Sequence, residues 1–126
     1  WGLDENQIQN LLVPQGVGPS KEILSRLISS DSIRNALNEL LSTKYKELVP
    51  PEEDPIEAIS KFERAFEISI YNSMRAQFVR IFSFSTVVAI TRLLDFEIRN
   101  LAAIAYAVEQ KIPAQTVMER LIIKQD

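Results

Sequence analysis

The chain has 126 residues with a formal net charge of −3; 46% of them are hydrophobic and 25% charged, and neither cysteine nor histidine occurs. The composition fits one folded globular domain, but it excludes disulfides, thiolate metal sites and any nucleophilic or metal-binding machinery that needs histidine. A general nucleic-acid binder is also disfavoured, because neutralising phosphates requires a surplus of Lys and Arg.

The first 49 residues predict three short helices. Asp4 is a suitable N-cap for a helix through Leu12, and Ser20 is a suitable cap for a second helix. The polar cluster at residues 29–31 ends the second helix and caps a third, which fades near Ser42. Each helix is too short to be stable alone, so we expect all three to pack on the rest of the chain.

A proline-rich and acidic segment at residues 50–54 predicts a linker, because proline disfavours helix in the residue before it. We interpret its acidic side chains as a solvated surface. Asp54 followed by Pro55 is a favourable helix start. Apolar residues then recur every three or four positions as far as Ile81, which predicts a helix over about 55–81, roughly 40 Å long.

A break at residues 82–85, with Ser85 as the next N-cap, precedes a second long helix over about 85–110. Its apolar stripe, which we call the second stripe, consists of Val87, Ile90, Leu94, Ile98, Leu101, Ala105 and Val108. Residues 111–113 end this helix, and residues 114–122 predict a short terminal one. A short connection between long amphipathic helices favours an antiparallel pair.

The predicted fold is therefore all-α. It is a long antiparallel helical hairpin (55–81 and 85–110) packed with the short N-terminal helices and a short C-terminal helix, in a single domain over residues 1–126. Within it, residues 1–49 hold the short helices, 50–54 the linker, and 55–122 the hairpin with the terminal helix.

Four polar residues of the hairpin are candidates for structural or interface roles. Glu97 falls near the middle of an apolar arc of the second long helix, with Asn100 at its edge, and Glu63 falls within about 20° of the apolar stripe of the first. Arg99 forms an i, i+4 pair with Asp95 and belongs to a solvated or interface face.

The two carboxylates have three possible roles. If the hairpin folds at residues 82–84, Glu97 lies level with Ile70 and Glu63 level with Ile104, roughly 10 Å apart along the axis. That spacing exceeds the separation in a retaining glycosidase and is marginal for an inverting one. We interpret both as satisfied structural carboxylates, because an unpaired buried carboxylate is costly, with an intersubunit contact second and acid–base catalysis third.

The segment DFEIRNLAAIA at residues 95–105 resembles the C-terminal helix of the family that comprises the C subunit of archaeal A-type ATP synthases and the d subunit of eukaryotic V-type ATPases. That family carries an E-x-[RK]-N run followed by I-x-x-I-A. Glu97, Arg99 and Asn100 occupy the three specified positions. The LLSTKY run at residues 40–45 is similar to the family's repeated L-x-x-T-x-Y element. Ser85 departs from the pattern, since many members have glycine there.

The resemblance is clearest over residues 33–122 and implies the C-terminal one of three related helical units, as a fragment of a longer protein. It implies a non-catalytic central-stalk (rotor) subunit that couples a rotating shaft to the membrane proteolipid ring during ATP-linked proton or sodium transport. The expected partners are the shaft subunits and that ring, with no nucleic acid and no cofactor. The resemblance also implies a cytoplasmic location, peripheral to the membrane. The longest uncharged run in the helical half, Ile81–Thr91, is too short to span a membrane.

A generic helical adaptor is the alternative. Such a module docks a partner helix in the groove beside the hairpin, and it requires no relation to a rotary ATPase.

Overall fold

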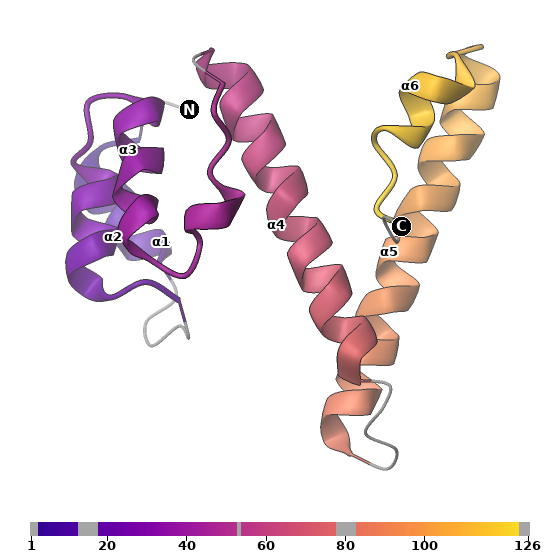
Figure 1. Ribbon diagram of the computed structural model, residues 1–126, viewed down its shortest axis with the longest axis horizontal. Helices are drawn as coiled ribbons and strands as arrows, with labels where there is room; N and C mark the ends of the chain where they lie inside the picture. Colours follow the sequence, from indigo (N-terminus) through magenta and orange to yellow (C-terminus); the bar gives the residue numbers. More distant parts are fainter. Residues whose placement is uncertain (1–2, 13–17, 53, 78–82, 124–126) are drawn as a thin grey trace. The chain divides into compact units, whose positions relative to one another are not determined.

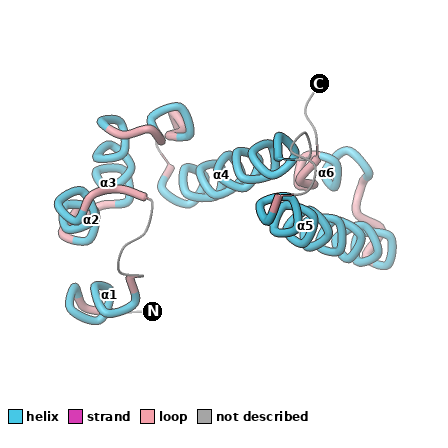
Figure 2. Tube along the Cα trace, turned by 90° about the horizontal axis from the view of Figure 1, so that it is seen from below, coloured by secondary structure: helices cyan, strands magenta, loops and turns pink. Residues whose placement is uncertain are grey.

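The computed structural model describes residues 3–12, 18–52, 54–77 and 83–123, and every regular element in these ranges is helical (Figures 1 and 2). In chain order these elements are α1 (Glu5–Leu11), α2 (Lys21–Ile28), α3 (Ile33–Glu39), the 3₁₀ turns η1 (Leu40–Ser42) and η2 (Lys46–Leu48), α4 (Pro55–Gln77), α5 (Phe84–Glu109) and α6 (Ala114–Met118). This confirms the predicted all-α class and its long helical hairpin.

The chain divides into two compact units, Trp1–Phe62 and Glu63–Asp126. The boundary lies inside α4 rather than at the proline-rich segment. The sequence-based division into one domain with a linker at residues 50–54 stays a prediction.

The short helices of the first unit begin where local side-chain caps form. Asp4 accepts a hydrogen bond from the Gln7 amide at 2.8 Å, while the Gln7 side chain accepts one from the Asp4 amide, so that a capping box starts α1. Ser20 caps α2 as predicted. The α3 cap is Ser32, one residue beyond the predicted cluster, because its hydroxyl accepts from the Asn35 amide at 3.1 Å.

A small apolar core holds the first unit together. Leu37 and Leu40 are buried against Ala58 in the first turns of α4. Half-buried side chains surround this centre: Leu27, Tyr45, Val49 and Phe62. The short helices are therefore stabilised by tertiary contacts, as their length requires.

Hydrogen bonds and ion pairs hold the acidic segment before α4 to its neighbours; Asp54 and Glu57 are exposed, as the sequence predicted, and Glu52 is half-buried. Arg34 on α3 donates to the carbonyls of Pro50 and Glu52, at 2.8 and 3.2 Å. Lys61 on α4 binds the Glu52 carboxylate and, at 2.9 Å, that of Glu57. The Lys61 hydrogen bond is the main cause that lowers the pKa of Glu52, and the same bond raises the pKa of Lys61.

In the second unit, α4 and α5 run antiparallel and meet through side chains. The rings of Tyr71 and Phe96 pack edge to face with centroids 5.9 Å apart, and Arg99 binds Glu67 at 2.7 Å. This register places residue 71 level with residue 96, in agreement with the predicted level of Glu97 and Ile70. None of the described helices combines the length and apolar character needed to cross a membrane.

The boundaries of the hairpin differ from prediction in two places. The N-cap of α5 is Ser83, not Ser85, because the Ser83 hydroxyl accepts from the Thr86 amide at 3.3 Å. The terminal helix ends at Met118 rather than at residue 122. The predicted end of the first long helix, at residues 78–81, lies outside the described residues.

The apolar stripe of α5 is not the face that the helix buries. The buried residues of this helix are Ala89, Phe96 and Ala107, whereas the large residues of the second stripe are exposed, from 41% for Ile90 to 74% for Val108. The inner face of α5 thus carries two small alanines beside Phe96. The bulkier stripe is left facing outward.

Candidate protein-interaction site

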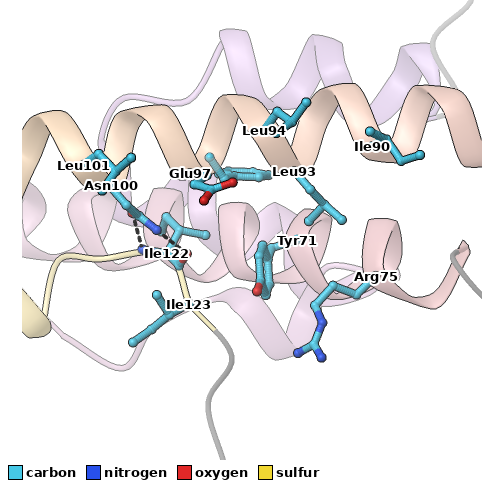
Figure 3. Close-up of a pocket in the computed structure, with 11 residues that line it drawn as sticks. Tyr71, Arg75, Ile90, Leu93, Leu94, Glu97, Asn100, Leu101, Ile122 and Ile123 are labelled. Carbon is cyan, nitrogen blue, oxygen red and sulfur yellow. Dashed lines mark hydrogen bonds between the residues drawn. The ribbon is translucent and has the colours of Figure 1, made fainter.

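A groove of about 660 Å³ lies in the second unit between α4, α5 and the segment that follows α6 (Figure 3). Most of its lining is apolar, contributed by Ile90, Leu93, Leu94, Phe96, Leu101, Ile122 and Ile123. Four polar side chains also line it, those of Tyr71, Arg75, Glu97 and Asn100. An apolar hollow with a few polar groups is typical of a binding site.

Asn100 builds one wall of the groove. Its side-chain amide donates to the Ile122 carbonyl at 2.7 Å, and its carbonyl accepts from the Ile122 amide at 3.0 Å, as the dashed lines in Figure 3 show. Both backbone polar groups of Ile122 are thereby satisfied without a helix. Leu121 and Ile122 can then be buried in a non-helical segment, with 5% and 7% of their surface exposed.

The other three predicted residues lie at different places. Glu97 lines the groove and is exposed, whereas Glu63 is exposed on α4 and does not line it. Arg99 pairs with Glu67 and Asp95 and lies over the Phe96 ring, 4.8 Å from its centroid. The groove therefore brings together Glu97 and Asn100, while Arg99 belongs to the contact between the two long helices.

Sequence reasoning did not identify Ile122 as the partner of Asn100 or Glu67 as the partner of Arg99. Tyr71 and Arg75 line the groove from α4, and Ile122, which the sequence did not point to, lines it from the C-terminal segment. Glu67 was also missed, although it lies on the predicted first helix close to the level of Arg99. Applying the hairpin register to oppositely charged residues would have found it.

Two charged groups at the groove are left without an ion pair within the described part of the chain, namely Arg75 and Glu97. Arg75 contacts the face of the Tyr71 ring, 5.8 Å from its centroid. By contrast, Arg92, Asp95, Arg99 and Glu67 form a connected set of ion pairs. Unmatched, exposed charges beside apolar surface suit contact with another protein.

The two candidate carboxylates do not meet in this groove. The paired-carboxylate mechanism considered from the sequence needs both carboxylates in one cleft, but of the two candidates only Glu97 lines the groove. Among the described residues, no group of three or more His, Cys, Asp or Glu side chains is placed to hold a metal ion.

Residues 2–120 match the family model described as ATP synthase (C/AC39) subunit. The chain is 31% identical over 122 residues to the C subunit of the A-type ATP synthase of Pyrococcus horikoshii, a match that covers 94% of this chain and 32% of the relative. The C subunits of the A-type ATP synthases of Pyrococcus abyssi and Pyrococcus furiosus are 30% and 29% identical to it, over 93% and 94% of this chain and 32% of each relative. The chain thus spans about a third of the length of these relatives. No solved structure matches it significantly.

Proposed function

Because the chain belongs to the ATP synthase (C/AC39) subunit family, we propose that it serves as a non-catalytic subunit in the central stalk of an A- or V-type rotary ATPase. The observation that carries the proposal is the family match over residues 2–120, nearly the whole chain. In this role the protein couples the rotating shaft to the membrane proteolipid ring while ATP turnover drives, or is driven by, proton or sodium movement.

The long helices support a mechanical role. α4 and α5 have 23 and 26 residues, and neither contains glycine or an interior proline. Uninterrupted helices of this length, roughly 35 and 39 Å at 1.5 Å per residue, resist bending better than loop-rich structure does. A part that passes torque between two others requires that stiffness.

The test is affinity purification of the endogenous protein through a tag, from membranes solubilised in mild detergent. We expect shaft subunits and the proteolipid to co-purify, with the protein released from the membrane only together with the complex. The purified chain alone should show no ATP hydrolysis. Recovery of an intact rotary ATPase that lacks the protein would contradict the proposal.

A second candidate, the generic helical adaptor, is favoured by the exposed apolar surface of α5. The same purification separates the two functions. An adaptor would be recovered with partners unrelated to ATP synthesis or ion transport, and deleting it would leave ATP-driven ion transport intact.

A further inference from the structure

The exposed second stripe of α5 has the spacing of a helix–helix seam. Its seven residues follow one another in steps of three and four. These steps average about 3.5 residues, the period at which two helices keep one face together. Ile98 and Leu101 expose 66% and 59% of their surface. Exposed apolar residues that are this regular mark an interaction site more often than a random scatter does.

The groove and the second stripe form one continuous surface, because Ile90, Leu94 and Leu101 belong to both. The surface runs from Val87 to Val108, which is roughly 32 Å of helix. A small molecule would fill the groove and leave most of this length uncovered. A second helix laid along α5 would cover both.

The unmatched charges define what that helix must carry. Tyr71 lies against Phe96, so Arg75, four residues nearer the helix connection, lies about level with residue 92. Arg75 and Glu97 are therefore about 8 Å apart along the axis. A helix that binds here gains from an acidic side chain opposite Arg75 and a basic one opposite Glu97, about one and a half turns apart.

We propose that the second stripe and the groove together dock one amphipathic helix of a neighbouring subunit, with apolar residues in steps of three and four and an acid–base pair matched to Arg75 and Glu97. The proposal rests on the proposed function only in placing that neighbour in the same rotary complex. The surface itself is defined by this chain's residues.

The absence of cysteine allows a clean accessibility test. Ile98→Cys places a thiol in the second stripe, and Ile56→Cys, at a residue that is 77% exposed on the first turn of α4, is the matched control. In the assembled complex we expect a water-soluble maleimide to label Ile98→Cys more than about tenfold slower than in the isolated chain, because a helix covers it. Labelling of Ile56→Cys should change little.

A photoactivated cross-linker on the same thiol then identifies the occupant. We expect the adduct to lie in a helical segment of another protein of the complex that has the stated apolar spacing and charges. Glu97→Arg should weaken recovery of that protein about three- to tenfold, and Glu63→Arg, on an exposed carboxylate outside the groove, should not. Reversing the matched basic residue of the partner should restore recovery.

The outcomes separate the two proposals. Co-purification with the ATPase, but equally fast labelling of Ile98→Cys in the complex and alone, would overturn the docking surface and leave the proposed function standing. Protection of Ile98→Cys by a protein unrelated to the ATPase would support the surface and overturn the function. Adducts that are confined to this chain, or that fall on a segment without helical apolar spacing, would also overturn the surface.

Discussion

Lys111 ends α5 in a backbone conformation that an L-residue adopts at a cost. Its φ is 55°, the only positive value among the described non-glycine residues. The Ile112 amide donates to the Ala107 carbonyl at 2.9 Å and the Lys111 amide to the Val108 carbonyl at 3.3 Å. This is the Schellman pattern, in which glycine is the usual residue at the left-handed position.

Lys111→Gly should therefore stabilise the fold. Relief of the left-handed strain, offset in part by the greater freedom of glycine in the unfolded chain, predicts a gain of about 0.5–1 kcal/mol. Urea unfolding followed by circular dichroism measures it. Lys111→Ala removes the same charge but keeps the Cβ atom, so an equal gain in that variant would assign the effect to charge instead.

Asn100 has a structural effect that its place beside an apolar arc did not reveal. Asn100→Ala leaves the buried Ile122 amide and carbonyl without their side-chain partner, and we expect a loss of about 1–3 kcal/mol in unfolding free energy. Gln115→Ala is the matched control, because the Gln115 amide makes only an exposed 3.4 Å bond to Glu119. Comparable losses in the two variants would contradict a specific role for Asn100.

At the scale of elements, the segment before α4 predicts a pH dependence. The folded-state pKa of Glu52 is lowered below its ordinary 4.5, chiefly by Lys61, so the ion pair contributes stability above pH 4.5. That contribution is lost as the pH falls through the lowered value. The pKa of Lys61 is raised, so on the alkaline side stability is lost only as the pH rises through a value above 10.5.

Glu52→Gln should be less stable than the parent at neutral pH, and the difference should shrink as the pH falls below 4.5. Urea unfolding at a series of acidic pH values measures this. Glu57→Gln, which leaves the Glu52–Lys61 bond in place, should retain most of the parent's acid dependence. A constant difference between Glu52→Gln and the parent across the series would contradict the argument.

The starts of the helices were predictable wherever an N-cap side chain determines them. The caps at Asp4, Ser20 and Asp54 act within three residues of themselves, so the sequence predicts the starts of α1, α2 and α4. The inward face of α5 was not predictable, because apolar residues occur on all sides of this helix and periodicity cannot choose among them. The groove depends on the hydrogen bonds between Asn100 and Ile122, which are 22 residues apart. Local sequence patterns do not predict a contact over that separation.

At the scale of the whole molecule, the exposed second stripe affects behaviour in solution. An apolar face of this length favours self-association when no partner covers it. Ile98→Glu should lower the concentration-dependent association of the isolated chain, measured by analytical ultracentrifugation, while changing unfolding free energy by less than about 0.5 kcal/mol. Ile56→Glu, elsewhere on the surface, should leave association unchanged; an equal fall in both variants would show that added charge alone is responsible.

The two hydrogen bonds between the Asn100 side chain and the Ile122 backbone also control hydrogen exchange at Ile122. The Ile122 amide hydrogen can exchange with solvent only when its hydrogen bond to the Asn100 side chain breaks. The rate of deuterium uptake at Ile122 therefore reports how often the C-terminal segment separates from α5. A partner helix bound against Ile122 would stabilise these hydrogen bonds and slow deuterium uptake at the Ile122 amide. Deuterium uptake at the Ile122 amide thus measures, without any label, whether a partner occupies the groove that Ile122 and Asn100 line.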